Sequence, residues 1–374
     1  MNLNSYGGKM RRNEIDWIRN IGVLLLFVFH TASIFTYYEP WYICSYSKSW
    51  LATIIFISCI PWHMPILFFL AGASTRFSLR NRSGEKYIWE RVKRLLIPFI
   101  LGMLILVPPQ GYFARVSRGK PVGNYFQQWK YFWTTISDIP YDGGLGPAHL
   151  WFILYLFIIS IVALLIIRSF RRDGMKRFLL KLKDKLTSKY SFIFTILIFF
   201  IADMTPLAIA QKNILTFLIV FLVGYIVYGD NDYLKYMDKN KGKSLIMTLI
   251  FLTIYIIVIL YNYNLNNNGN LGLKVLLSIM KNGIMITTIV AIIGYGGKYL
   301  NRGGKVLDYL NRACFPIYIL HQTIIVIISY YLLNYTLPMY LSILIIIVSS
   351  VLITFGIYEV VKRIKIIRFL IGIK

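Results

Sequence analysis

The chain has 374 residues, of which 57% are hydrophobic and 16% aromatic, and its mean hydropathy is +0.61. These values exceed those of a soluble domain, and its apolar runs of about twenty residues suit membrane-spanning helices rather than the shorter strands of a membrane β-barrel. The net charge of +26 would favour a nucleic-acid partner only if one soluble face carried it. We therefore expect an all-α integral membrane protein.

Ten transmembrane helices are predicted from the apolar runs. If the N-terminus is cytoplasmic, about 33 of the 41 Lys and Arg residues fall in the tail, the alternate loops and the adjoining helix ends on that side. This asymmetry places both termini in the cytoplasm and explains the basic excess without nucleic acid. No segment between spans is long enough to fold alone, so residues 1–374 are predicted to form one domain. The predicted spans are 18–38, 51–72, 95–113, 148–168, 190–209, 213–229, 244–263, 274–296, 313–334 and 338–361.

The first span carries two ionisable residues, Arg19 and His30, in the run IDWIRNIGVLLLFVFH. At about 100° per residue, a step of eleven positions returns to nearly the same helix face, roughly 16 Å further along. A histidine at that depth can act as a general base, and an arginine nearer the cytoplasm can bind a phosphate or carboxylate. Interhelical packing would explain both residues equally well, and this pattern alone leaves the choice open.

The segment 73–94 is strongly basic and cytoplasmic in the predicted topology. It contains Arg76, Arg91 and Arg94, which we select as candidates for binding a phosphate-bearing donor. Topology alone also predicts positive charge in such a loop.

Other polar residues near or within spans have packing or functional interpretations. His63 is expected to make an interhelical hydrogen bond or to act in the site, and Asp203 and Lys281 to form an ion pair. His149 lies at the outer mouth of the fourth span, where it can face water or an external substrate. His321 of the ninth span is a candidate second polar group in the cavity of His30. The three cysteines show no metal-ligand spacing, so no metal site is expected.

Several ordered motifs resemble the acyltransferase-3 family of membrane acyltransferases. The arrangement of Arg19 and His30 is similar to the signature of that family's first helix. Four further elements occur in the family's order, and together they extend over most of the chain; two of them resemble in particular the branch that includes glucan succinyltransferases. These elements are WHMPILFFLAG at 62–72, ERVKRLLIPFILG at 90–102, GPAHLWFILYL at 146–156 and FPIYILH at 315–321.

The resemblance implies transfer of an acyl group, commonly acetyl or succinyl, from cytoplasmic acyl-coenzyme A to a hydroxyl of an extracytoplasmic carbohydrate or lipid-linked glycan. His30 and Arg19 are then the catalytic candidates, and Arg76, Arg91 and Arg94 the donor-binding ones. The matching motifs contribute His149, Trp151 and His321 to acceptor binding. The acyl-coenzyme A is a substrate rather than a permanent cofactor, the remaining partners are membrane lipids, and the expected location is the bacterial cytoplasmic membrane.

Two other classes of function compete with this interpretation. A proton-coupled transporter or flippase of a glycan or lipid intermediate would also use intramembrane His and Arg, but it favours inverted repeats or paired broken helices, which we do not find in the sequence. A structural membrane protein would tolerate changes at Arg19 and His30.

Overall fold

The computed structural model describes residues 12–38, 40–80, 82–137, 139–170, 172–209, 212–265 and 270–372. Over these ranges the regular structure is almost entirely helical, and the one sheet is a short antiparallel hairpin that pairs Ala208 with Asn213. The expected all-α fold is confirmed. The elements are α1 Asn13–Ile34, α2 Trp50–Cys59, α3 His63–Ser78, α4 Gly84–Arg91, η1 Val92–Leu96, α5 Ile97–Ile105, α6 Val107–Ser117, α7 Tyr125–Thr134, η2 Pro140–Asp142, η3 Ala148–Leu150, α8 Trp151–Ser169, α9 Asp173–Leu186, α10 Ser191–Asp203, β1 Ala208–Ile209, β2 Lys212–Asn213, α11 Ile214–Val227, α12 Asn231–Leu265, α13 Leu271–Tyr299, α14 Lys305–Leu332, α15 Met339–Val361 and α16 Lys365–Leu370.

Within the described residues, eight helical stretches are long and apolar enough to cross a membrane. They coincide with eight of the ten predicted spans. The second and third are broken helices, made of α2 with α3 and of α4 to α6. The eight stretches are α1, Trp50–Ser78, Gly84–Ser117, Ala148–Ser169, Asn231–Asn262, α13, α14 and α15.

The other two predicted spans, 190–209 and 213–229, fall on short helices. α10 has 13 residues and α11 has 14, so each is only about 20 Å long, less than a hydrocarbon core of about 30 Å. α10 is also bent by 118° from the preceding α9. The total of ten spans and the cytoplasmic position of the termini therefore stay predictions.

The amphipathic helix α9 has no buried residue and is fastened to the start of α12 by a lysine. Lys183 donates hydrogen bonds to Asp230 at 2.6 Å and to Asp232 at 2.7 Å. These bonds raise the pKa of Lys183, and the bond from Lys183 lowers the pKa of Asp230. The outward faces of Phe178 and Leu180 stay exposed, as suits a helix at a membrane surface.

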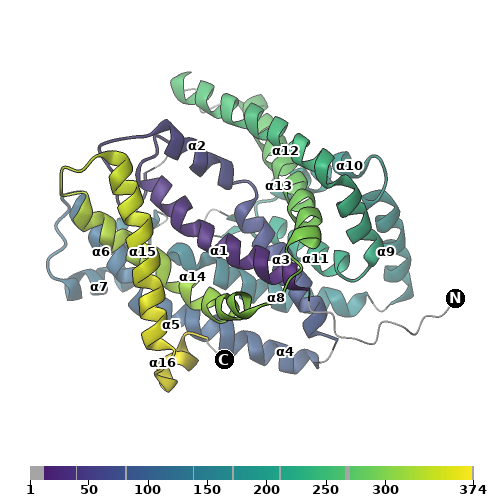
Figure 1. Ribbon diagram of the computed structural model, residues 1–374, viewed down its shortest axis with the longest axis horizontal. Coiled ribbons are helices and arrows are strands. Elements are labelled where there is room, and N and C mark those ends of the chain that lie inside the picture. Colours follow the sequence, from purple (N-terminus) through teal and green to yellow (C-terminus); the bar gives the residue numbers. More distant parts are fainter. Residues whose placement is uncertain are drawn as a thin grey trace.

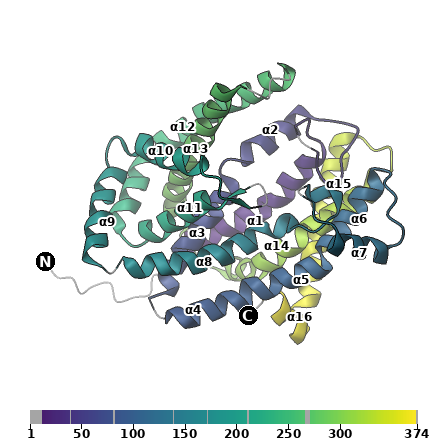
Figure 2. The ribbon, with the colours of Figure 1, turned by 180° about the vertical axis from the view of Figure 1, so that it is seen from behind.

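Helices α1 and α14 pack side by side and run parallel. Arg19 of α1 contacts Asn311 of α14, and eleven residues further along α1, His30 lies beside His321 of α14. Because both pairs advance in the same chain direction, the two helices point the same way across the bundle. Figure 1 shows α1 through the middle of the molecule with α14 and α15 on one side of it. Figure 2 is the view from behind, in which α8 and α5 lie towards the viewer.

The helices α3 and α11 cross at unusually short range, at two glycines. A Cβ atom added to Gly72 would lie 1.8 Å from the carbonyl oxygen of Phe221, and one added to Gly224 would lie 2.0 Å from that of Phe69. Only glycine permits this backbone contact, which is typical of small residues at membrane helix crossings. The crossing fixes the position of α3, whose C-terminal turn carries Arg76.

Candidate active site

Three of the four histidines meet in the interior of the bundle. The ring centroids of His30 and His321 are 5.2 Å apart, and those of His149 and His321 are 5.3 Å apart. They come from α1, from α14 and from the turn η3 before α8. The structure places His321 beside His30 and brings His149 into the same cluster, while the roles predicted for these residues stay predictions.

His149 uses both of its ring nitrogens on the protein. Its Nε2 lies 2.8 Å from the carbonyl oxygen of Ile319, which can only accept, so Nε2 carries the proton. Its Nδ1 then accepts from Gln110 Nε2 at 3.3 Å. The hydroxyl of Tyr318 donates to the backbone carbonyl of His149, and the preceding Ala148 has a left-handed φ of 46°. This strained turn is held in place by its contacts with α14 and α6.

His321 has only one of its ring nitrogens occupied. Its Nδ1 lies 2.5 Å from the carbonyl oxygen of Tyr318, one turn back along α14, so Nδ1 donates and Nε2 bears a lone pair. The residue is 1% exposed, and Nε2 has no hydrogen-bond partner within the part of the chain described. Pro316 lies inside the same helix and leaves one backbone carbonyl without its usual donor.

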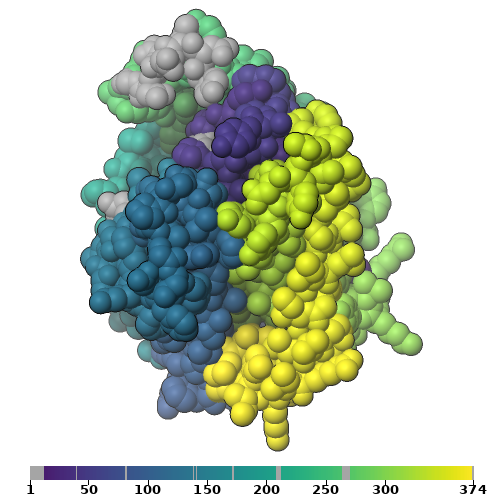
Figure 3. All heavy atoms as spheres, turned by 90° about the vertical axis from the view of Figure 1, so that its left-hand side faces the viewer, coloured from purple at the N-terminus to yellow at the C-terminus, as the bar shows by residue number. Residues whose placement is uncertain are grey.

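His30 is half-buried and lies beneath an outer loop. Its Nδ1 is buried and lacks a partner among the described residues, and its ring stacks on Trp41 with centroids 5.5 Å apart. Arg118, after α6, donates to the carbonyls of Trp41 and Tyr42 and so holds this loop over the histidine. Burial raises the pKa of Tyr42 and keeps its hydroxyl neutral. Figure 3 shows the purple N-terminal part of the chain above α6 and α7 in blue and beside α14 and α15 in yellow-green.

A group of buried amides and hydroxyls supports the histidines and was missed by the sequence analysis. Gln110 Nε2 donates to Thr323 Oγ1 at 2.8 Å, and Gln322 Nε2 donates to Gln110 Oε1 at 2.8 Å. Thr323 in turn donates to the carbonyl of Leu106 at 2.9 Å. These bonds tie α6 to α14 at the level of His149. The sequence feature that could have identified this group is Gln110, a glutamine within an apolar span, where polar residues are rare.

The fourth histidine, His63, has a packing role. Its Nε2 lies 2.6 Å from the carbonyl oxygen of Gly22, and this bond joins α3 to α1 within the bundle. Gly22 also allows Leu67 to approach, because an added Cβ would come within 3.0 Å of Leu67 Cδ2. The expected interhelical hydrogen bond of His63 is confirmed.

Arg19 lies in a polar cluster on the same face of α1 as His30, eleven residues before it. Its Nη2 is 2.5 Å from Asp16 Oδ1 and 3.2 Å from Asn311 Oδ1. Asn20 Nδ2 donates to the same Asn311 oxygen at 3.0 Å. The carboxylate of Asp16 offsets the charge of Arg19, so Arg19 is a weaker anion-binding group than an unpaired arginine would be.

A basic cavity of about 540 Å³ lies between α3, the start of α4 and the end of α8. Arg76 Nη1 donates to the hydroxyl of Tyr225 at 3.1 Å, and its guanidinium carbon lies 5.1 Å from the centroid of that ring. Its Nε is buried and has no partner among the residues described here. The cations that line this cavity are Arg76, Arg80, Arg82 and Arg168.

The other predicted site residues, Arg91, Arg94 and Trp151, are not among those that line the basic cavity. Arg91 is placed over the ring of Tyr87, 4.6 Å from its centroid, and neither Arg91 nor Arg94 lines the basic cavity. Trp151 packs edge-to-face against Tyr155 with centroids 5.3 Å apart. The sequence analysis missed Arg168, because this residue lines the cavity only when the end of α8 packs beside α3.

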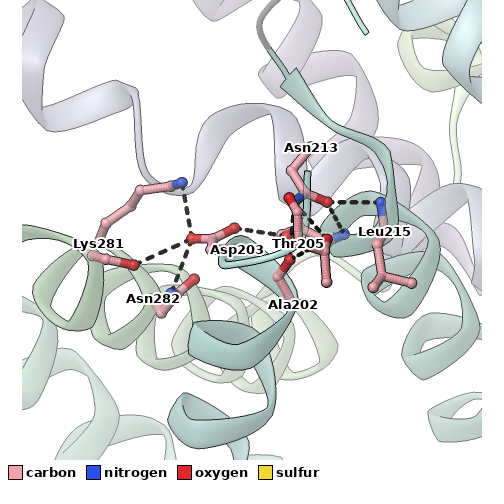
Figure 4. A network of polar contacts seen from close by, with 9 residues as sticks. Ala202, Asp203, Thr205, Asn213, Leu215, Lys281 and Asn282 are labelled. Atoms are coloured by element: carbon pink, nitrogen blue, oxygen red, sulfur yellow. Dashed lines mark hydrogen bonds and ion pairs between the residues drawn. The ribbon is translucent and has the colours of Figure 1, made fainter. Parts of the chain in front are cut away.

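The polar residues Asp203 and Lys281 form the expected ion pair, 3.2 Å between Oδ2 and Nζ. Asp203 also accepts from Thr216 Oγ1 at 2.7 Å and from Asn282 Nδ2 at 3.2 Å. Figure 4 shows this network joining the ends of α10 and β2 to α13. It gives the short helices α10 and α11 a fixed position.

The fold and the site define a multi-pass helical membrane protein with a buried histidine cluster and a separate basic cavity. A family model described as an acyltransferase domain matches residues 12–359, nearly the whole chain. The chain belongs to this family, acyltransferase-3, and is a membrane O-acyltransferase. No curated protein and no solved structure matches it. The resemblance to the glucan succinyltransferase branch stays a prediction.

Proposed function

We propose that the protein transfers an acyl group, acetyl or succinyl, from cytoplasmic acyl-coenzyme A to a hydroxyl of an extracytoplasmic carbohydrate or lipid-linked glycan. The observation that carries the proposal is the pairing of an interior histidine centre with a basic cavity in one acyltransferase chain. The proposed location is the bacterial cytoplasmic membrane, with the cavity on the cytoplasmic side.

The basic cavity is our candidate for the donor's phosphates. Guanidinium groups match phosphate oxygens with paired hydrogen bonds, and Arg76 has a buried Nε that no described residue satisfies. Arg168 and His149 lie at opposite ends of the stretch Ala148–Ser169, about 28 Å apart at 1.5 Å per residue. A long, thin pantetheine arm would bring the thioester from one end of α8 towards the other.

His30 is our candidate for the general base. It takes the proton of the acceptor hydroxyl while the oxygen attacks the thioester carbonyl, so that a C–O bond forms and the C–S bond breaks. The coenzyme A thiolate leaves and receives the proton back from His30. The buried, aromatic surroundings of His30 exclude water, which would otherwise hydrolyse the thioester.

The remaining predicted contacts are retained as part of the proposal. Arg19 is half-buried beside Asp16, at a point along α1 that the donor's arm would pass on its way to His30. Arg91 and Arg94 contribute positive charge near the donor's entry rather than direct contacts. His149 orients the cluster, and Trp151 and His321 flank the path of the acceptor.

Incubating the full-length protein in membranes with labelled acetyl- or succinyl-coenzyme A tests the proposal. We expect one donor to leave alkali-labile label in a glycan or glycolipid fraction, and the His30→Ala variant to leave none. Movement of a glycan or lipid across the membrane without consumption of either donor would contradict acyl transfer and favour the transporter.

A further inference from the structure

Three side chains at the contact of α1 with α14 form a closed ring of hydrogen bonds, the Arg19 ring. Arg19 Nη2 donates to Asp16 Oδ1 at 2.5 Å and to Asn311 Oδ1 at 3.2 Å, and Asn311 Nδ2 donates to Asp16 Oδ2 at 3.1 Å. Asn20 is joined to the ring, because its Nδ2 donates to the same Asn311 oxygen at 3.0 Å. Asn311 therefore contacts all three of the other residues.

The chemistry of these groups fixes the direction in which each amide points. A carboxylate can only accept, so Asn311 turns its Nδ2 to Asp16 and its Oδ1 to Arg19. Asn20 must then present its Nδ2 to that oxygen, which leaves its buried Oδ1 without a partner among the described residues. An unsatisfied buried amide oxygen calls for an explanation, and the geometry of the Arg19 ring supplies one.

The ring determines which donors of Arg19 remain for a ligand. Nη2 carries two hydrogens and makes two bonds, and both edges of a guanidinium that bind a phosphate with paired hydrogen bonds include Nη2. The N–H groups of Nη1 and Nε remain, on a side chain that is 35% exposed and lies beside the thiol of Cys314. Because Asp16 also offsets the positive charge, Arg19 suits a single neutral carbonyl oxygen better than a phosphate.

We propose that Asn311 positions Arg19 to donate to an amide carbonyl in the arm of the acyl donor. This inference rests on the proposed function. A pantetheine arm carries amide groups between its phosphates and its thioester, and Arg19 lies eleven residues, roughly 16 Å, from His30 along α1. When the thioester is at His30, a part of the arm nearer the phosphates lies beside Arg19. The phosphates are left to the arginines of the basic cavity.

Exchanging the acid and the amide separates positioning from charge. In the double variant Asp16→Asn with Asn311→Asp, every bond of the ring can form again, because the new amide donates to the new carboxylate and an oxygen at each position still accepts from Arg19. Asp16→Asn alone sets two amide N–H groups against each other at the place of the 3.1 Å bond. Asn311→Asp alone sets two carboxylate oxygens against each other there.

The two probes are coenzyme A and adenosine 3′,5′-bisphosphate, a nucleotide that has phosphates but no arm. Their Kd values are measured by calorimetry on the full-length protein in lipid nanodiscs. We expect each single substitution to raise the Kd of coenzyme A by about tenfold or more, and the double variant to return it to within about threefold of the wild type. The Kd of the bisphosphate should stay the same in all four proteins.

Charge alone predicts a different pattern. Asp16→Asn removes a negative charge and Asn311→Asp adds one, so the two single variants would change the Kd of an anionic ligand in opposite directions. Such opposite shifts would overturn the proposal. An equal loss for both probes would assign Arg19 to the phosphates and would overturn it as well.

Asn240→Asp is the matched control, because it adds the same charge on α12, where Asn240 Nδ2 donates to the carbonyl of Tyr236 at 2.9 Å. It should leave both Kd values unchanged, and a loss as large as that of Asn311→Asp would refute the positioning role. Coenzyme A binding without acyl transfer by the wild type would contradict the proposed function alone. Acyl transfer with an unchanged Kd for coenzyme A in both single variants would contradict this inference alone, and a wild type that binds no coenzyme A would contradict both.

Discussion

His30 and His321 lie at the same level of two parallel helices, with ring centroids 5.2 Å apart. At the other end of the same contact, Arg19 meets Asn311 across 3.2 Å. The interface between α1 and α14 therefore has a charged end and an imidazole end. In the proposed function, the donor enters from the charged end and the acceptor reaches the histidines from the opposite end.

Substituting His30 is expected to lower the rate of acyl transfer strongly and to change the stability of the protein little. His30→Ala should lower kcat by about 10²–10⁴-fold, the contribution that a positioned general base makes. Because the buried Nδ1 of His30 makes no hydrogen bond to the residues described, the substitution removes only ring packing on Phe29 and Trp41, and the thermal midpoint should move little. Label transfer and thermal unfolding of the purified protein measure the two effects. A wild-type rate in the variant would refute the assignment.

His63→Ala should show the opposite pattern. The substitution leaves the carbonyl of Gly22 buried without its donor, 2.6 Å away in the wild type, and should lower stability by about 1–3 kcal/mol. The rate per folded molecule should stay close to that of the wild type, because His63 contacts the backbone of α1 rather than the histidine cluster. A large loss of kcat at unchanged stability would instead place His63 in the site.

Arg76→Ala is expected to raise the KM for acyl-coenzyme A by about tenfold or more with a smaller effect on kcat. It removes a partly buried guanidinium that a phosphate would otherwise pair with. Lys176→Ala is the matched control, since it removes the same charge from α9, where Lys176 contacts Asp173 at 2.8 Å. Equal KM values for both variants would mean that the cavity does not bind the donor.

The crossing of α3 and α11 predicts a large effect of a single methyl group. Gly72→Ala would place a Cβ 1.8 Å from Phe221 O, so the two backbones must separate, at an expected cost of about 3 kcal/mol. Gly297→Ala on α13 meets nothing within 4 Å and should stabilise the protein by up to about 1 kcal/mol. Thermal unfolding in detergent measures both, and equal midpoints would contradict the close contact.

The sequence predicted features that depend on one helix or on simple charge matching. The stripe of Arg19 and His30 follows from helical periodicity, and the pair of Asp203 and Lys281 from the cost of an unpaired charge in a membrane. The sequence alone did not predict the ion pair of Asp16 with Arg19, because side chains three residues apart on a helix can each contact other neighbours instead. The bonding of Arg19 depends on Asn311 as well, which arrives from α14.

The residues that were missed depend on the register between helices. Gln110 reaches His149 only because the proline-rich start of α6 places it opposite α14, and Arg168 enters the basic cavity only because α8 ends beside α3. Side-chain packing sets such registers, and neither spacing nor composition encodes them directly. The junction between α10 and α11 depends on such a register as well, since Asp203 at the end of α10 contacts Thr216 of α11 and Lys281 of α13.

The ion pair of Asp203 and Lys281 allows a test by a double-mutant cycle. Asp203→Asn leaves the ammonium of Lys281 within the span without its carboxylate, and should lower stability by about 1–3 kcal/mol, a range that allows for the partial exposure of Lys281. Lys281→Met removes the charge and keeps the length of the side chain. In the double variant the amide introduced at position 203 can still accept from Thr216, and no unpaired charge remains.

We therefore expect the double variant to be more stable than Asp203→Asn alone, by about 1 kcal/mol or more. Chemical denaturation in mild detergent, followed by tryptophan fluorescence, would measure the four free energies of unfolding. Additive effects of the two substitutions would show that the pair contributes no coupling energy. In that case the hydrogen bonds from Thr216 and Asn282, rather than the charge of Lys281, would hold α10 and α11 against α13.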